Sequence, residues 1–412
     1  MTSLAAHGGT RTLDVAGPHY RWPVVDDGLE NAVLRQMHRS LSDRDAQGVI
    51  GEFEQAFARF LGVPHAVSFS SGTAAIHAMS RICGLRPGDA VIAPAYTFFA
   101  TASPFGFDGV EVRFADADEY GNVTAETLAA QMAPNVRAVI VTHMWGNPCA
   151  IDAIATFCRD HDLLLLEDCS HAHFASWVGS RVGTVSDMAV FSTNQKAITT
   201  GEGGLLVTGN DRFRELAVLY AHYNKRSLKE IDPSAAHYPF AFTGMGLKHR
   251  ITTLGAAMGV HQLDIAKSIE SRRRAVLAAF DTGLTGNPVV RTVLVPRDQG
   301  EHGLYVVGLR FDADAADVTR DEFVRLVVAE GAVEIDAPGS TRDISAEPLF
   351  TRRDPFADWV APTGTAPGTA RPGVHRFESS FLKTPIWGYA GDDELVSGYI
   401  AALHKVSEAV AR

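Results

Sequence analysis

The sequence contains few cysteines, and their arrangement is not that of a metal site. Four cysteines are spread over 412 residues, without the paired spacing of a zinc-binding motif. A chain of this length can bury a large core and needs no disulfide framework. We therefore expect reduced thiols, no metal centre and a cytoplasmic protein. The cysteines are Cys83, Cys149, Cys158 and Cys169.

Long apolar runs and clusters of basic residues are also missing. No apolar stretch approaches the roughly 20 residues of a membrane span, and the first sixteen residues lack the charged-then-apolar order of a signal peptide. We expect no membrane partner and a loose tail at the N-terminus. The net charge of −11 is distributed without a basic run, which argues against a nucleic-acid partner.

Short apolar runs rich in Val, Ile and Leu recur through the first two thirds of the chain. They are typical of buried strands, and segments with helical periodicity separate several of them. This alternation predicts an α/β fold with a mostly parallel sheet. The expected strands are 90–95, 110–115, 138–142, 163–167, 188–191 and 205–208, and the expected helices are 73–84, 124–132 and 151–160.

The pattern changes after about residue 250. A long helix from Ile251 toward Phe280 is expected to bridge into a smaller C-terminal domain. The predicted organisation is an N-terminal segment 1–45, a large domain 46–265, and the bridging helix with a small domain over 266–412. Residues 354–372 are crowded with Pro, Gly, Thr and Ala, which predicts a mobile loop.

The first motif that could bind a ligand is the run from Ser70 through Ser71 and Gly72 to Thr73. It follows a short apolar segment and opens a predicted helix. A helix N-terminus with small hydroxyl residues offers free N–H groups and a positive dipole end to a phosphate. Alternatively, these residues are an ordinary helix N-cap.

The second motif is a predicted strand that ends in Glu167 and Asp168. Ligands of open α/β sheets bind beyond the carboxyl ends of the strands, where a buried carboxylate needs a cationic partner. A protonated pyridine nitrogen is one such partner, and Asp168 would hold its proton in place. The alternative is a helix cap at the strand end.

The third motif runs from Phe191 to Gly204 and contains Lys196 and a Gly-Glu-Gly-Gly turn. A lysine in a pocket at the sheet edge can lose its charge by desolvation and form an imine with a carbonyl cofactor. The glycines would let the backbone pass close to a flat ring. A surface lysine in a glycine turn is the commoner case for a single lysine.

The three motifs occur together, each at a predicted strand end, in the order phosphate, pyridine nitrogen and Schiff-base lysine. With SSGTAAIHA, PAYTFFATA, THMWGNPCAID, LEDCSHAH, the lysine-to-GEGG segment and RITTLGAAMGVHQL, the chain resembles the DegT/DnrJ/StrS-type family of aminotransferases. The resemblance implies a fold-type I enzyme that uses pyridoxal 5'-phosphate (PLP). It further implies a seven-stranded central sheet in a PLP-binding large domain and an α+β C-terminal domain.

The resemblance assigns roles to individual residues. It implies that Ser71, Gly72 and Thr73 bind the cofactor phosphate together with Ser192, and that Phe98 stacks on the pyridine ring. Asp168 would pair with the ring nitrogen, His171 would lie near the cofactor hydroxyl, and Lys196 would form the Schiff base. The catalytic residues would be Lys196 and Asp168.

Two departures from the family pattern affect these roles. The interval from Ser192 to Lys196 is one residue short, so Thr193 or Asn194 is an alternative phosphate ligand. Lys248 stands where the family has an asparagine that reaches a phosphate in the neighbouring subunit. A lysine can serve there as a point charge, and alternatively it belongs to the substrate pocket or to the surface.

The resemblance implies transfer of an amino group from glutamate or glutamine to a keto-sugar, often nucleotide-linked, or to a keto-cyclitol, in amino-sugar or natural-product biosynthesis. It also implies a homodimer with shared active sites. Arg21-Trp22-Pro23 with Asp26 resembles the start of members acting on cyclitols or on an aminohydroxybenzoate precursor. The alternatives are other PLP-dependent dehydration, elimination or condensation, and a non-catalytic regulator on the same fold.

Overall fold

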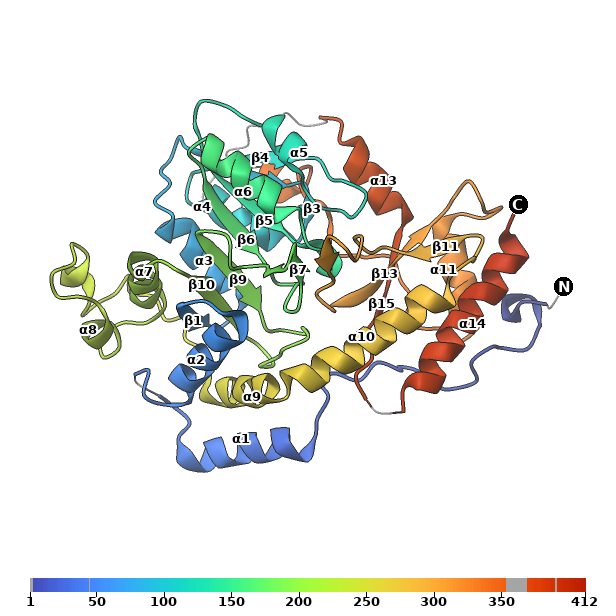
Figure 1. The fold of residues 1–412 in the computed structure, drawn as a ribbon, viewed down its shortest axis with the longest axis horizontal. Coiled ribbons are helices and arrows are strands. Elements are labelled where there is room, and N and C mark those ends of the chain that lie inside the picture. The colour runs from blue at the N-terminus through green and yellow to red at the C-terminus, as the bar shows by residue number, and fades with distance from the viewer. Residues whose placement is uncertain (1–2, 44, 353–368, 390) are drawn as a thin grey trace.

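The computed structural model describes residues 3–43, 45–352, 369–389 and 391–412. A seven-stranded sheet with the order β1-β10-β9-β6-β5-β2-β4 forms its larger part (Figure 1). Only β10 runs antiparallel to its neighbours, so the predicted mostly parallel sheet is confirmed. The strands are β1 (His65–Phe69), β2 (Ala90–Pro94), β4 (Glu111–Ala115), β5 (Val136–Thr142), β6 (Leu164–Asp168), β9 (Met188–Ser192) and β10 (Gly204–Thr208).

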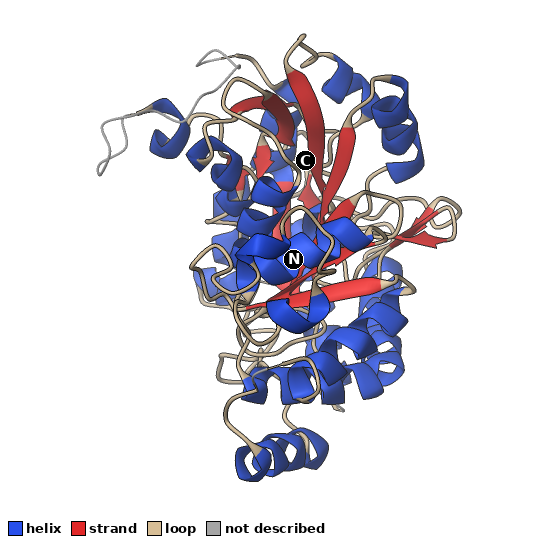
Figure 2. Cartoon of the chain, turned by 90° about the vertical axis from the view of Figure 1, so that its left-hand side faces the viewer, coloured by secondary structure: helices blue, strands red, loops and turns tan. Residues whose placement is uncertain are grey.

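Both faces of this sheet are buried, which explains the continuous apolar strands. Along β2, Val91 and Ala93 belong to one core and Ala90 and Ile92 to another, since successive side chains point to opposite faces. Figure 2 shows helices on both sides of the strands. The helices of this part of the chain are α2 (Val49–Leu61), α3 (Gly72–Ile82), α4 (Ser103–Phe107), α5 (Ala125–Ala129), α6 (Ile151–Asp160), α7 (Asp211–Ala221), α8 (Ser227–Glu230) and α9 (Thr253–Asp264).

Two helix predictions need correction. The helix expected over 124–132 ends at Ala129, because the last turn tightens into bonds from Gln131 N to Leu128 O and from Met132 N to Ala129 O. The long helix expected from Ile251 begins at Thr253 and breaks at Ile265, between α9 and α10 (Ala266–Gly283). The two halves pack on different partners, α9 on α1 (Asp27–Arg39) and α2, and α10 on α14 (Asp393–Val410).

A second, smaller sheet follows α10. Its strands β11 (Val290–Thr292), β13 (Val306–Phe311) and β15 (Phe381–Pro385) are antiparallel. Together with α10, α14 and α11 (Arg320–Ala329), they enclose a separate apolar core. The α+β character of this region is as predicted, and the domain boundaries at 45 and 265 stay a prediction.

The expected loose tail at the N-terminus is wrong for the residues from Ser3 onward. Leu4 and Leu13 are buried in the core of the smaller sheet, where full burial of one such side chain contributes about 1.5–3 kcal/mol. The carboxylate of Glu330 accepts hydrogen bonds from the backbone N–H groups of Ala5 and Thr12. The tail is therefore held by apolar contacts and hydrogen bonds to residues far along the chain.

The remaining elements are short. The expected mobile loop 354–372 lies mostly outside the described residues, and its end, Pro372, begins helix α13. The four cysteines are unpaired, as expected. No described helix is long and apolar enough to cross a bilayer. The remaining short elements are β3 (Tyr96–Thr97), β7 (Ser176–Trp177), β8 (Ser180–Arg181), β12 (Gly300–Glu301), β14 (Arg342–Asp343), α12 (Pro348–Thr351), α13 (Pro372–Ser380), and the 3-10 helices Ala5–His7, Phe99–Thr101, Met144–Gly146 and Tyr238–Phe240.

Candidate functional site

Asp168 ends strand β6 and is buried, with 4% of its surface exposed. Its Oδ2 accepts a hydrogen bond from the Thr101 hydroxyl at 2.7 Å, and its Oδ1 accepts one from the N–H of Ser170 at 3.1 Å. The hydroxyl groups of Thr97 and Thr101 share a hydrogen bond of 3.0 Å. Both donors to Asp168 are neutral, and no described cation pairs with this carboxylate. A buried carboxylate in this state fits a cationic ligand atom.

A cluster of three nearly parallel rings follows this strand end. The His171 ring centroid lies 5.2 Å from that of Trp145 and 4.2 Å from that of Tyr305, and the Trp145 and Tyr305 centroids are 6.1 Å apart, with the rings within about 22° of parallel. Burial, followed by the charge of Lys196, holds the pKa of His171 well below its usual value. The imidazole is therefore neutral at pH 7. Its Nδ1 is buried and has no hydrogen-bond partner among the described residues.

Lys196 follows strand β9, which pairs directly with β6. Its Nζ lies 4.1 Å from the centroid of the Tyr305 ring, a cation–π distance. Because Tyr305 also stacks on His171, Lys196 and His171 both contact the same aromatic ring. The predicted catalytic lysine and the histidine thus share one site.

His173 ties together the two ends of the loop that carries Lys196. The Ile198 N–H donates to His173 Nδ1 at 3.1 Å, and the Ser192 carbonyl lies 2.8 Å from Nε2. Nδ1 is thus an acceptor, so Nε2 carries the proton and donates it to Ser192. Burial lowers the pKa of His173 to about 3, which keeps this arrangement intact at neutral pH.

The predicted phosphate loop lies against the other end of the same segment. A Cβ on Gly72 would lie 2.7 Å from the Ser192 Cβ, and a Cβ on Gly204 would lie 2.6 Å from the Gly72 N. Glycine is therefore required at both positions for the start of α3 to approach β9 and β10. This is a role for Gly204 in protein packing, whereas the sequence suggested that it makes room for a ring.

The hydroxyl groups around this loop differ in how they are engaged. Ser71 caps α3 by accepting the Ala74 N–H, so its proton is still available to a ligand, and Thr73 is exposed. Thr193 shares a hydrogen bond with Thr200, and the Asn194 amide donates to Glu202. These contacts, together with the closeness of Ser192 to Gly72, favour Ser192 over the two alternatives as a phosphate ligand.

Two of the predicted residues, Phe98 and Lys248, have no described contact with Asp168, His171 or Lys196. Phe98 is half-buried and its ring lies 4.0 Å from that of Phe99. The side chain of Lys248 is exposed and lines a different pocket from Lys196, together with Tyr223, Lys225 and Arg250. Within one chain, the structure therefore does not bring Lys248 to the Lys196 site.

Glu167, the neighbour of Asp168, points away into a buried hydrogen-bonded pair. Its Oε2 accepts from His143 Nε2 at 2.8 Å and from the Gly183 N–H at 3.0 Å. His143 Nδ1 accepts the Cys149 N–H, so Nε2 keeps its proton. Burial alone would raise the pKa of Glu167, but the His143 contact brings it below its usual value.

This pair and Cys169 have ligand atoms within 4.8 Å of one another, a spacing that could hold a metal ion. However, the only imidazole nitrogen on the carboxylate side is already protonated. Burial, and then Glu167, raises the pKa of the Cys169 thiol well above its ordinary value. The donor set therefore favours a structural hydrogen-bonded pair.

The residues fit PLP in the places that matter most. Among the described residues, the buried Asp168 has no cationic partner and Nδ1 of the neutral His171 has no hydrogen-bond partner, and the lysine amine contacts the Tyr305 ring that stacks on His171. The sequence interpretation assigned no role to Thr101, His173 or Tyr305. Thr97 and Thr101 are spaced four residues apart, a usable signal, whereas no local pattern distinguishes Tyr305, which comes from a distant part of the chain.

The chain matches known proteins over most of its length. Residues 30–351 match the model of the DegT/DnrJ/EryC1/StrS aminotransferase family. It is 31% identical to GDP-perosamine synthase of Caulobacter vibrioides, over 80% of this chain and 83% of that protein. It is also 31% identical to a putative L-glutamine:3-amino-2,3-dideoxy-scyllo-inosose aminotransferase of Micromonospora echinospora, over 68% and 66%.

The fold has solved counterparts as well. The X-ray structure of the aminotransferase from Psychrobacter cryohalolentis superposes with a TM-score of 0.83, covering 95% of this chain and all of that one at 23% identity. Its fold is therefore that of fold-type I aminotransferases, as predicted. The chain belongs to the DegT/DnrJ/EryC1/StrS aminotransferase family and is a PLP-dependent aminotransferase.

Proposed function

We propose that the enzyme moves an amino group from L-glutamate or L-glutamine to a ketone carbon of a sugar or cyclitol, in amino-sugar or natural-product biosynthesis. The donor leaves as a 2-oxo acid and the acceptor as an amine, so the exchange balances. The observation that carries the proposal is the position of two residues at the ends of adjacent strands: Asp168, whose carboxylate has no described cationic partner, ends β6, and Lys196 follows β9.

PLP, when bound, supplies a carbonyl carbon that accepts the amino group and a ring that takes up an electron pair. Asp168 would hold the protonated ring nitrogen, and Thr101 would keep its carboxylate oriented through the 2.7 Å bond. Lys196 would anchor the cofactor and, once displaced by the donor, would take the donor's α-proton. The start of α3, with Ser71, Gly72 and Thr73, would bind the phosphate with Ser192.

The neighbours of these residues exclude water and fix positions. Trp145 and Tyr305 each stack against His171, and its neutral ring would donate or accept a hydrogen bond at the cofactor hydroxyl. His173 holds both ends of the loop that carries Lys196. Phe98 would cover one face of the ring, since an aromatic face does not compete for its protons.

The printed names of the relatives support the acceptor class. One is named for the synthesis of GDP-perosamine, and another carries a putative name that includes L-glutamine and a scyllo-inosose. Residues 223–242 contain α8 and the 3-10 helix Tyr238–Phe240. We propose that this segment and 354–372 select the acceptor.

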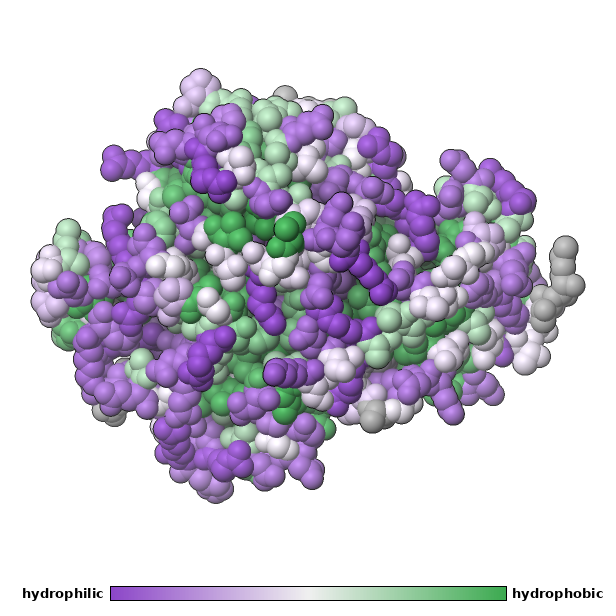
Figure 3. Space-filling view, viewed as in Figure 1, coloured by the Kyte–Doolittle hydropathy of each residue, from purple (hydrophilic) through white to green (hydrophobic). Residues whose placement is uncertain are grey.

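We also propose a homodimer with shared active sites. Lys248 lies in its own basic pocket of about 280 Å³, and apolar side chains close to it in sequence are exposed, among them Phe240, Phe242 and Met245. A second copy could cover these side chains and receive Lys248 at its phosphate site. Figure 3 shows further apolar side chains on the lower part of the molecule, over α9 and α1.

The experiment adds each donor in turn to the PLP-loaded protein with a keto-cyclitol or a nucleotide-linked keto-sugar. The proposal predicts an aminated product and one equivalent of 2-oxo acid. Loss of a hydroxyl or formation of a new carbon–carbon bond, without 2-oxo acid, would favour the other PLP reactions. Mixing inactive Lys196→Ala and Lys248→Ala chains should restore activity if sites are shared, and a fully active monomer would contradict the dimer.

A further inference from the structure

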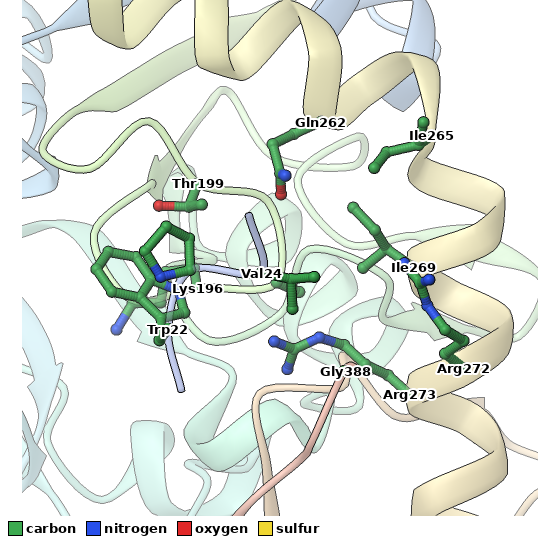
Figure 4. A pocket seen from close by; sticks show the side chains of 12 residues that line it. Trp22, Val24, Lys196, Thr199, Gln262, Ile265, Ile269, Arg272, Arg273 and Gly388 are labelled. Atoms are coloured by element: carbon green, nitrogen blue, oxygen red, sulfur yellow. The ribbon is translucent and has the colours of Figure 1, made fainter. Parts of the chain in front are cut away.

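A cleft next to Lys196 collects positive charge without a carboxylate to balance it. Lys196, Arg272 and Arg273 line it, and none of its described lining residues is acidic. Figure 4 shows Arg273 reaching from α10 toward the side of the cleft where Lys196 and Trp22 lie, with Gln262 above. The net charge of the chain is −11, so the local charge of this cleft is opposite in sign to that of the molecule as a whole.

The two arginines lack the partners that buried guanidinium groups need. Arg273 is 6% exposed, and its one described hydrogen bond goes to the Leu304 carbonyl at 3.0 Å. The Nε of Arg272 is buried and has no partner among the described residues. By contrast, the next residue on the helix, Arg274, is paired with Glu270 and Glu301. A buried cation without an acid is costly, so the cleft is suited to an incoming anion.

Trp22 adds a third unused donor. Its Nε1 is buried without a hydrogen-bond partner in the described structure. The segment that carries it is held in place, because the Arg21 guanidinium lies 4.0 Å from the Tyr389 ring centroid and the Tyr389 hydroxyl donates to the Pro23 carbonyl. The indole N–H therefore belongs to a preorganised wall of the cleft.

We propose that this cleft binds the α-carboxylate of the amino donor, held by Arg272, Arg273 and the indole N–H of Trp22. The inference rests on the proposed function, since the donor's α-carbon must come within reach of the Lys196 amine and its carboxylate is one bond away. Guanidinium groups match the planar, two-oxygen geometry of a carboxylate. The residues predicted to hold the cofactor phosphate, Gly72 and Ser192, do not line this cleft.

The test uses the PLP-loaded full chain and glutarate, a dicarboxylate that resembles the donor but has no amino group to transfer. Arg272→Gln and Trp22→Phe should each weaken glutarate binding about 10-fold or more, the effect of losing a hydrogen bond to a charged group. Arg274→Gln, on the same helix, should bind glutarate like the parent. The neutral diamide glutaramide should bind no better to the parent than to Arg272→Gln. Thermal melts check that each variant folds.

The outcomes separate the inference from the function on which it rests. Unchanged glutarate binding in folded Arg272→Gln and Trp22→Phe would overturn the inference, as would loss of PLP instead of glutarate, which would assign the cleft to the cofactor phosphate. A KM increase for L-glutamate but not for L-glutamine would overturn the α-carboxylate assignment. If neither donor yields a 2-oxo acid while the variants still lose glutarate, the carboxylate site stands and the proposed function fails.

Discussion

Glu167 and Asp168 are neighbouring buried carboxylates at the end of one strand, yet their surroundings differ. Glu167 accepts hydrogen bonds from the N–H of a neutral imidazole and from a backbone N–H through Oε2, so this oxygen is satisfied within the protein. Asp168 points to the other face of the sheet, where a threonine hydroxyl and one N–H are its described partners. Both carboxylates are buried and neither has a described cationic partner, so burial does not identify the functional one. Asp168 is distinguished by its place as the last residue of β6, beside the strand that leads to Lys196.

The largest expected effect comes from removing the side-chain amine of Lys196, which follows the strand next to the one that Asp168 ends. Lys196→Ala should lower kcat by about 10⁴-fold or more, because both the cofactor anchor and the proton carrier are lost. Steady-state assays with the proposed donor measure the loss, and Lys229→Ala, an exposed lysine paired with Asp45, serves as control. Substantial turnover by Lys196→Ala would break the assignment.

Replacing the carboxylate itself sharpens the comparison. Asp168→Asn should lower kcat about 100- to 1,000-fold, because an amide cannot balance a protonated ring nitrogen. The fold should persist, since the amide oxygen can still accept the Thr101 hydrogen bond. Kinetics and a thermal melt on the same preparation decide this, and a variant with near-normal kcat would remove Asp168 from the mechanism.

Replacing Glu167, the other buried carboxylate, should affect the stability of the fold and leave the catalytic reaction unchanged. Glu167→Gln should reduce the free energy of unfolding by about 1–3 kcal/mol, since its new NH₂ group has no acceptor in place and loses hydration. Denaturant titration gives this number, and kcat per folded enzyme should stay near the parent value. A collapse of kcat like that of Asp168→Asn would erase the distinction.

The last expected effect is that of acid. Burial lowers the pKa of His173 to about 3 and that of His302 to about 4, from 6.5. The unfolded chain takes up these protons below pH 6.5 while the folded protein does not, so stability is present above pH 6.5 and is lost as the pH falls toward 4. Each histidine should cost about 1.4 kcal/mol per pH unit in that range.

Denaturant titrations at constant ionic strength between pH 8 and 4.5 measure this slope. His302→Gln should make the slope shallower by the share of one histidine. A stability that stays flat from pH 6.5 to 4.5 would show that these histidines are not held neutral in the fold.

The sequence predicted the strands well and the long-range contacts poorly. Each expected strand of the large sheet appears within two residues of its predicted ends, because continuous apolar runs between helices have few other solutions. The break at Ile265 and the burial of Leu4 and Leu13 depend on partners far along the chain. No local pattern encodes such contacts, and the same holds for Tyr305 under Lys196.

The site shows the same division. Asp168, His171 and Lys196 stand at strand ends, where fold rules direct attention, and the structure places His171 and Lys196 on one aromatic ring next to Asp168. Lys248 could be assigned only by resemblance, and within one chain it lies in another pocket. Arg272 and Arg273 look like ordinary helix residues in the sequence, and only the absence of acids around them reveals a charge imbalance.

The most direct test of the central claim is to find which lysine anchors the cofactor. The protein is loaded with PLP, treated with borohydride to fix the cofactor to the amine that holds it, digested and analysed by mass spectrometry. The account predicts the added mass on the peptide that contains Lys196. Modification confined to other lysines, or no modification at all, would contradict it.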